Sequence, residues 1–139
     1  MERLPVKVLS ALLLSLSLCL PALAEEEQKE AAPQTLYYNL VPSLIGNLAD
    51  GGNRLKFFKA DVALRVSGAE AEARIKHHDP LIRHQLVLLF SAQTSETINA
   101  PDGREKLRQQ ALTQVQQALE AEEGKPMVED LLFNNLIIQ

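Results

Sequence analysis

Residues 55–66, Leu-Lys-Phe-Phe-Lys-Ala-Asp-Val-Ala-Leu-Arg-Val, carry the clearest structural signal in the sequence. Apolar side chains occupy every second position in most of this stretch, and charged side chains lie between them. Because successive side chains of a strand point to opposite faces, this period of two predicts a β-strand with one buried face and one solvated face. The apolar set is Phe58, Ala60, Val62, Leu64 and Val66, and the charged set is Lys59, Asp61 and Arg65.

A second strand signal precedes this stretch. Residues 35–48 are rich in Tyr, Leu, Val and Ile, and Pro42 interrupts them. This pattern predicts one strand or a pair of short strands, with the proline at an edge or a bulge. Asp50-Gly51-Gly52-Asn53 follows as a turn signal, because glycine accepts a positive φ without strain. We therefore predict an antiparallel hairpin whose first arm covers residues 38–48.

Helical patterns follow Gly68. Residues 69–76 favour a helix by propensity. Asp79 before Pro80 predicts an N-cap with proline at the first helical position, so a new helix is expected from Pro80 to Gln93. Its segment 86–90 is apolar all round, which predicts burial on several sides. If this helix packs on a sheet, one of its faces is left for a second layer or a neighbouring subunit.

The last third of the sequence predicts a long helix and a final strand. The helix follows a loop at 99–103 and ends before Gly124 and Pro126. In residues 127–139 neither parity is cleanly apolar, which indicates a central strand covered on both faces. Three polar residues in that strand, Asp130, Asn134 and Asn135, are expected to mark a bulge. The helical stripe consists of Leu107, Ala111, Leu112, Val115, Ala118 and Leu119.

These elements predict an α+β fold. A small antiparallel sheet is expected from residues 38–48, 55–66 and 128–138, with two main helices packed against it. The predicted domain covers residues 35–139, and residues 25–34 precede it as an acidic, flexible tether.

The first residues have the pattern of a secretory signal. Arg3 and Lys7 precede an apolar run, and Pro-Ala-Leu-Ala at 21–24 offers the small residues that a signal peptidase reads. We predict a signal peptide over residues 1–24, cleaved after Ala24. The alternative is a short anchor in the inner membrane through residues 8–24, although a spanning helix needs about 20 apolar residues. A lipoprotein signal with its cysteine at Cys19 is a third alternative. Leu18 fits it poorly, because such signals place Gly, Ala or Ser just before the cysteine.

Charge and cysteine content narrow the class of protein. Cys19 is the only cysteine and leaves with the predicted signal, so the remainder has no disulfide, thiolate metal site or cysteine nucleophile. The net charge is −4, and loss of the signal removes more basic than acidic residues. An acidic chain argues against a nucleic-acid partner, because nucleic-acid binding depends on neutralising phosphates.

The search for catalytic chemistry finds little. The sequence has no G-x-S-x-G, H-E-x-x-H or glycine-rich phosphate loop, so we predict no enzyme and no cofactor. The three histidines are His77, His78 and His84. Zinc usually requires three or four ligands, and solvated histidines at the start of a helix are the simpler interpretation. A soluble periplasmic ligand- or metal-binding protein using this histidine group is the competing hypothesis.

Two aromatic pairs bear on binding. Tyr37-Tyr38 and Phe57-Phe58 place one ring on each face of their strands. The ring on the solvated face is either incidental exposed apolar surface or part of a subunit interface, where aromatic residues are enriched. Tyr37 and Phe57 are therefore candidate contacts.

The order of these landmarks resembles the flagellar basal-body-associated FliL family over residues 38–139. The resemblance is distributed along the whole predicted domain and ends at its last residue. The first strand carries Pro42, Leu44, Asn47 and Leu48; the middle helix carries Pro80, Ile82, Arg83, Leu86, Leu89 and Ser91; the next helix carries Gly103, Leu107 and Arg108; the last strand carries Val128, Phe133 and Gln139.

The resemblance implies a periplasmic domain of the stomatin/prohibitin type at the inner membrane and the basal body. It implies a non-catalytic motor accessory protein that self-associates into rings and contacts stator units. Arg83 and Arg108 are the expected polar contacts, within the domain or between subunits. Family members usually keep a membrane helix with a cytoplasmic stub, whereas residues 1–24 look cleavable here. The resemblance therefore implies either a FliL protein kept at the inner membrane or a FliL-like paralogue released into the periplasm.

Overall fold

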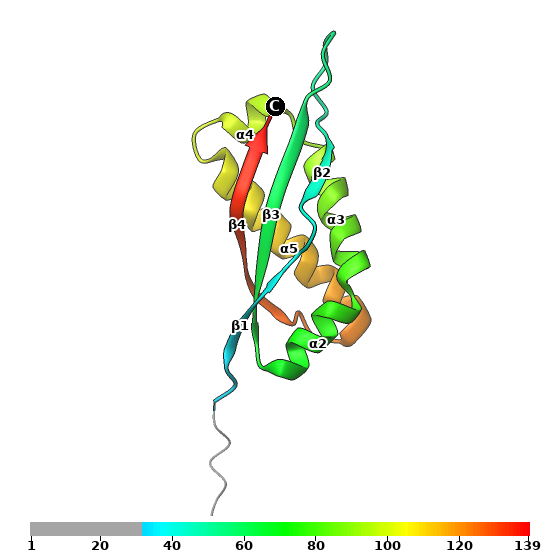
Figure 1. Ribbon diagram of the computed structural model, residues 1–139, viewed down its shortest axis with the longest axis vertical. Coiled ribbons are helices and arrows are strands. Elements are labelled where there is room, and N and C mark those ends of the chain that lie inside the picture. The colour runs from blue at the N-terminus through cyan, green and yellow to red at the C-terminus, as the bar shows by residue number, and fades with distance from the viewer. Residues whose placement is uncertain (1–31) are drawn as a thin grey trace, which may run out of the picture. The chain divides into compact units, whose positions relative to one another are not determined.

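The computed structural model describes residues 32–139, which form four strands and four helices (Figure 1). A small antiparallel sheet with packed helices confirms the predicted α+β class. The predicted signal peptide or anchor at 1–24 and most of the predicted tether at 25–34 lie outside the described residues. The elements are β1 (Thr35–Asn39), β2 (Leu44–Asn47), β3 (Phe57–Ser67), α2 (Ala69–His77), α3 (Asp79–Ser91), α4 (Ser95–Asn99), α5 (Gly103–Glu123) and β4 (Val128–Ile138).

Strand β3 lies at the centre of the sheet. On one side it pairs with β2 and then with β1, and on the other side it pairs with β4, always antiparallel. Residues 40–43, including Pro42, separate the two short strands, so the proline lies at a sheet edge as predicted. The predicted hairpin is confirmed, since Asn47 pairs with Phe57 across the turn segment.

The assignment of the last strand as central was wrong. Among the described strands β4 pairs with β3 alone and therefore forms an edge of the sheet. Its mixed pattern has another cause. Asp61 pairs with Asn135 and Val62 with Phe133, so Asn134 is left out of the ladder. This bulge, which the polar residues predicted, shifts the parity of β4 and gives apolar side chains at both parities.

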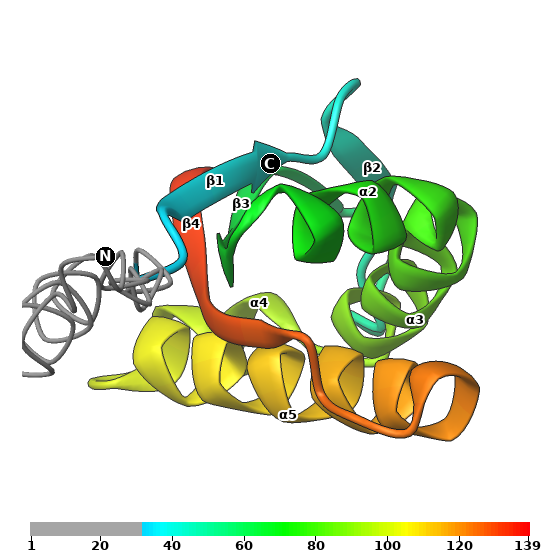
Figure 2. The same cartoon turned by 90° about the horizontal axis from the view of Figure 1, so that it is seen from below.

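The alternating apolar side chains of β3 lie in the core. Its even positions from Phe58 to Val66 are each at most 1% exposed. They pack against helices α3 and α5. Helix α5 lies behind the sheet in Figure 1 and below it in Figure 2, and α3 lies beside the sheet in both views. The rings of Phe58 and Phe90 meet edge to face at 5.4 Å between centroids, and Phe90 meets Phe133 at 5.8 Å. Such edge-to-face contacts are the geometry that aromatic pairs prefer.

The helices follow the predicted order with one correction and one addition. Asp79 was predicted as an N-cap, but it is the first helical residue of α3, and the residue before it makes no side-chain cap. Its carboxylate instead accepts a hydrogen bond from the Tyr38 hydroxyl, 2.8 Å away. The short helix α4 was not predicted; Thr94 caps it by accepting from the Thr97 amide. Within residues 32–139, no helix combines the length and apolar character needed to cross a membrane.

The apolar segment of α3 is buried on most sides, as predicted. Leu86 and Phe90 are at most 1% exposed, and Val87 and Leu89 pack at the margin of the core. Leu88 is the exception, with 53% of its surface exposed. This helix therefore leaves a single large apolar side chain in solvent.

Candidate interaction surface

The face of the sheet that points away from the helices carries exposed apolar side chains from all four strands. Tyr37 is 53% exposed, Ile45 64%, Phe57 45% and Ile137 37%. Residues paired across antiparallel strands share a face, and the register places all four on the side opposite Phe58. We call this side of the sheet the outer face. Exposed apolar patches of this kind often mark contact sites.

Three of these side chains surround one lysine. Ile45 in β2 and Ile137 in β4 both pair with Lys59 in β3, and Phe57 is the next outward residue of β3. A hollow of about 250 Å3 opens among them. Tyr37 lies further along the sheet, where it pairs with Arg65. The hollow is lined by Ile45, Phe57, Phe58, Lys59, Ile137 and Gln139.

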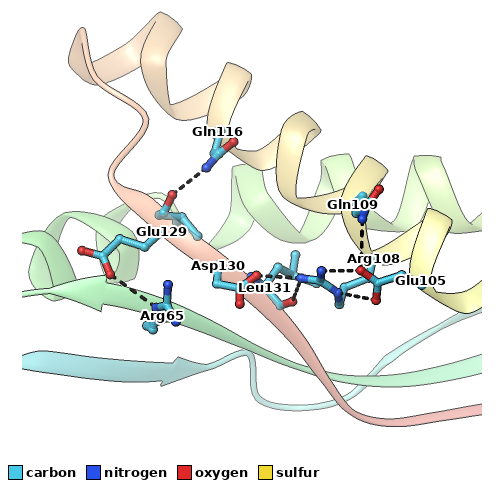
Figure 3. A network of polar contacts seen from close by, with 9 residues as sticks. Arg65, Glu105, Arg108, Gln109, Gln116, Glu129, Asp130 and Leu131 are labelled. Carbon is cyan, nitrogen blue, oxygen red and sulfur yellow. Dashed lines mark hydrogen bonds and ion pairs between the residues drawn. The ribbon is translucent and has the colours of Figure 1, made fainter.

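The outer face also carries charges of both signs along β3. Lys59 and Asp61 are consecutive outward residues, and the Asp61 carboxylate accepts a hydrogen bond from the Ser43 hydroxyl. Within residues 32–139 neither side chain takes part in an ion pair. Arg65, two outward positions further, is paired: its Nε lies 3.3 Å from Glu129 Oε2 (Figure 3). The centre of the outer face therefore holds one basic and one acidic group that form no ion pair with the described part of the chain.

Arg108, a predicted contact, forms a network inside the domain (Figure 3). Its Nη1 donates to Asp130 Oδ1 at 2.6 Å and to the Leu131 carbonyl at 3.2 Å, and its Nε donates to Glu105 Oε2 at 2.8 Å. The hydrogen bonds to Arg108 hold the pKa of Glu105 below its ordinary value. The same contacts raise the pKa of the guanidinium, which therefore stays charged.

Two further side chains of α5 also donate hydrogen bonds to the backbone of β4. Arg104 Nη1 donates to the Leu136 carbonyl at 2.8 Å, and Gln116 Nε2 donates to the Val128 carbonyl at 2.9 Å. Together with Arg108 they satisfy backbone carbonyls along the edge of β4 that faces away from β3. Unpaired carbonyls on an edge strand are a template for pairing with another chain, and these donors remove part of that template.

Arg83, the other predicted arginine contact, also binds within the domain. Its Nη1 donates to the Pro42 carbonyl at 2.7 Å, which joins α3 to the link between β1 and β2. The structure thus engages both arginines internally and leaves Tyr37 and Phe57 on the outer face. A role for any of the four in contacts with a partner stays a prediction.

The three histidines do not converge. His78 Nε2 lies 2.6 Å from Glu123 Oε1 at the end of α5, and its ring meets that of His77 with centroids 4.9 Å apart. His77 and His84 are exposed. The hydrogen bond with His78 is the main cause that lowers the pKa of Glu123. Residues 32–139 contain no group of three or more His, Cys, Asp or Glu side chains that is placed to hold a metal ion.

Tyr38 is the member of the Tyr37–Tyr38 pair that points to the helical side of the sheet. Its neighbour Tyr37 is on the outer face, whereas the Tyr38 hydroxyl reaches Asp79 at the start of α3. Burial, and then the hydrogen bond to Asp79, raise the pKa of Tyr38 to about 12. The two tyrosines thus divide between the two faces of β1, as predicted.

Sequence reasoning missed Ile45, Lys59 and Ile137 as members of the surface. The alternation along β3 already placed Lys59 on the face of the sheet opposite to that of Phe58. The two isoleucines were not, because their face depends on the register of β2 and on the bulge in β4. No signal within either short stretch fixes that register.

The fold and this surface define a small α+β domain in which helices cover one face of the sheet and the other face carries exposed apolar side chains. The sequence model of the family described as "Flagellar basal body-associated protein FliL" matches residues 37–139. The chain belongs to the FliL family.

Individual relatives agree with this assignment. The chain is 30% identical to the flagellar protein FliL of Aquifex aeolicus (strain VF5), over 80% of this chain and 66% of that protein. It is 25% identical to the flagellar protein FliL of Escherichia coli (strain K12), over 83% of this chain and 72% of the relative. The match to the Shigella flexneri protein has the same identity and coverage. The chain is thus related to flagellar basal-body-associated proteins.

Proposed function

We propose that this protein is a non-catalytic accessory component of the flagellar motor that self-associates and contacts the stator units. Membership of a basal-body-associated family supports the motor role. The single observation that carries the contact role is the open outer face with its exposed apolar side chains from every strand.

The outer face suits contact with protein better than catalysis. Ile45, Phe57 and Ile137 are exposed. When a partner covers them, burial of their apolar surface stabilises the complex by roughly 25 cal/mol per Å2. The charges beside them, Lys59 and Asp61, add electrostatic specificity without requiring a bound ion. Aromatic side chains such as Phe57 and Tyr37 are frequent anchors at such interfaces.

The site of action is proposed to be the periplasm at the inner membrane. Residues 1–24 are proposed to direct export, with cleavage after Ala24 or with residues 8–24 kept as an anchor, and residues 25–34 to tether the domain. Mass spectrometry of the protein isolated from its own cells distinguishes the two fates. A mature chain that begins at Glu25 establishes cleavage, and an intact N-terminus establishes the anchor.

A motility experiment tests the proposed function. A strain lacking the protein is complemented with the wild type, with Phe57→Ser or with Leu88→Ser, and swimming is measured in soft agar and in viscous medium. Leu88 is the matched control, because it is an exposed apolar residue on the helical side of the domain. We expect Phe57→Ser to swim poorly despite normal flagellar number and protein level, and Leu88→Ser to swim normally.

The deletion strain decides the broader question. If it swims as fast as the complemented strain in both media, the motor role is wrong. If it swims poorly but Phe57→Ser restores swimming as well as the wild type does, the motor role stands and the outer face is not its contact surface. Co-purification of stator proteins with the wild type but not with Phe57→Ser would support the stator contact.

A further inference from the structure

We propose that the hollow on the outer face receives an amphipathic helix of another protein, which places one apolar side chain in the hollow and a carboxylate, one helical turn away, on Lys59. The proposal rests on the partner contact put forward above and names the chemistry of that partner. Four features of the described residues define it: the size of the hollow, the lysine in its lining, the extent of the apolar surface and the state of the sheet edges.

The size of the hollow fits a single side chain. Its volume is about 250 Å3, whereas pockets for drug-sized molecules hold roughly 300–1,000 Å3. Its apolar walls are Ile45, Phe57 and Ile137, which are 37% to 64% exposed. Small apolar pockets of this kind take one anchoring side chain from a protein partner and remove it from water. The hollow therefore predicts an apolar side chain as its occupant.

Lys59 sets the charge of the partner. It pairs with Ile45 on one side and with Ile137 on the other, so it stands between two apolar walls. Within residues 32–139 it forms no ion pair, and the lining of the hollow includes no acidic side chain. A purely apolar partner would cover this charge without a counter-charge, which is costly. Charge complementarity therefore favours a carboxylate beside the apolar anchor.

The apolar part of the outer face is short. Asn134 Nδ2 donates to Asn39 Oδ1 at 3.2 Å, and this bond passes over β3 at Ala63, which is only 3% exposed. The surface available to the partner thus extends from Phe57 to this bond, which is roughly 20 Å of strand. A helix of about three to four turns spans this length. Such a small footprint is typical of a transient contact.

The sheet favours a helix over an added strand. A strand from a partner needs a free sheet edge for its backbone hydrogen bonds. On the long edge, Arg104, Arg108 and Gln116 occupy carbonyls of β4, and the opposite edge consists of two short strands separated by Pro42. A helix satisfies its own backbone groups and packs through its side chains, as α3 and α5 do on the other face.

Photo-crosslinking in the protein's own cells tests this assignment. A benzophenone amino acid replaces Leu55 or, in a second variant, Ile45 in the full-length chain, and mass spectrometry sequences the linked peptide. Leu55 is 71% exposed and lies two residues before Phe57. We expect a segment of another protein with Asp or Glu three or four residues from an apolar side chain, the spacing of one helical turn. A benzophenone at Leu88, on the helical side of the domain, should not capture this segment.

Charge reversal tests the role of Lys59. We expect K59E to lower the crosslink yield at Leu55 at least about fivefold, and reversal of the partner's acidic residue to Lys to restore the yield to within about twofold. K106E reverses an exposed charge on α5 and should leave the yield unchanged. Circular dichroism of the purified variants and immunoblots of the cells show that each variant is folded and present at the wild-type level.

Three results would overturn the assignment. The benzophenones at both positions link to lipid, to another copy of this chain or to nothing in swimming cells; or the linked segment has no acidic residue within one turn of an apolar one; or K59E leaves the yield unchanged. Swimming of the deletion strain decides the motor role separately. If that strain swims poorly and the crosslink fails, the proposed function stands and this partner is wrong.

Discussion

Arg108 Nη1 and Asp130 Oδ1 lie 2.6 Å apart, and this contact joins the N-terminal part of α5 to the first residues of strand β4. The same nitrogen donates to the Leu131 carbonyl, so one guanidinium ties the helix to both a side chain and the backbone of the strand. Three-quarters of each charged side chain is shielded from solvent, with 24% of Arg108 and 26% of Asp130 exposed. The pair therefore positions β4 and is a structural element of the domain.

Replacing Arg108 should destabilise the domain. Arg108→Ala removes the guanidinium donor from the Leu131 carbonyl and from the partly buried Asp130 carboxylate, which keeps only the Leu131 amide as a donor within residues 32–139. We therefore expect the free energy of unfolding to fall by about 1–3 kcal/mol. Urea unfolding followed by circular dichroism measures the change. Gln109→Ala is the control, because within residues 32–139 the hydrogen bond of that exposed side chain goes to Glu105 of the same helix. Equal stability of the two variants would contradict the structural role of Arg108.

Truncation of a ring in the aromatic cluster of the core should destabilise the domain more than the loss of Arg108. Phe90 contacts both Phe58 and Phe133 and is 1% exposed. Phe90→Ala removes these contacts and leaves a cavity, so we expect a loss of about 3–5 kcal/mol. Leu88→Ala on the same helix should change the unfolding free energy by less than about 0.5 kcal/mol. A comparable loss for both variants, measured in the same urea titration, would show that α3 packs differently.

The start of α5 depends on a glycine. A Cβ at position 103 would overlap the Thr97 carbonyl oxygen and lie 2.7 Å from that of Ile98, and both are backbone atoms that cannot turn aside. We expect Gly103→Ala to cost at least about 1–3 kcal/mol, because α4 and α5 must separate. Gly51→Ala is the matched control, since a Cβ there has no neighbour within 4 Å. The difference between their thermal midpoints measures the effect.

The contact between His78 and Glu123 predicts sensitivity to acid. The folded state lowers the pKa of Glu123 below its ordinary value of 4.5, mainly through the hydrogen bond with His78. Stability from this group is therefore present above pH 4.5 and is lost as the pH falls through the lowered pKa. Unfolding free energy plotted against pH should fall less steeply for Glu123→Gln than for the wild type in that acid range. Glu122→Gln, at an exposed neighbouring position, should retain the wild-type slope.

The raised pKa of Tyr38 predicts a loss of stability at high pH. Its pKa is raised from 10.0 to about 12 in the folded protein, first by burial and then by the hydrogen bond to Asp79. Stability from the neutral hydroxyl is present below pH 10 and is lost as the pH rises through the folded pKa. Tyrosinate absorbance should show a component near pH 12 that is missing in Tyr38→Phe. A wild-type titration without this component would contradict the contact.

Much of the fold could be predicted because its central strand is amphipathic. The alternation from Phe58 to Val66 identified both the strand and its buried face, and the apolar stripe of α5 identified the helix that covers it. The placement of β4 could not be predicted from its own residues. The bulge at Asn134 moves apolar side chains to both parities, which is also the pattern of a central strand.

The contact surface was predictable only in part. Adjacent Phe57 and Phe58 must point to opposite faces, so one exposed ring followed from the sequence alone. Ile45 and Ile137 join that ring through strand register, which is set by pairings between distant segments. The internal partners of Arg83 and Arg108 likewise depend on how the helices dock on the sheet. Only the structure places these side chains.

The hydrogen bonds that side chains of α5 donate to β4 also bear on aggregation of the protein at high concentration. A protein that gathers with its own kind creates a high local concentration of identical strands, which is the condition for growth into cross-β fibrils. Arg104, Arg108 and Gln116 occupy carbonyls where such growth would begin. Under the proposed self-association, these donors would therefore disfavour strand pairing between copies that lie close together.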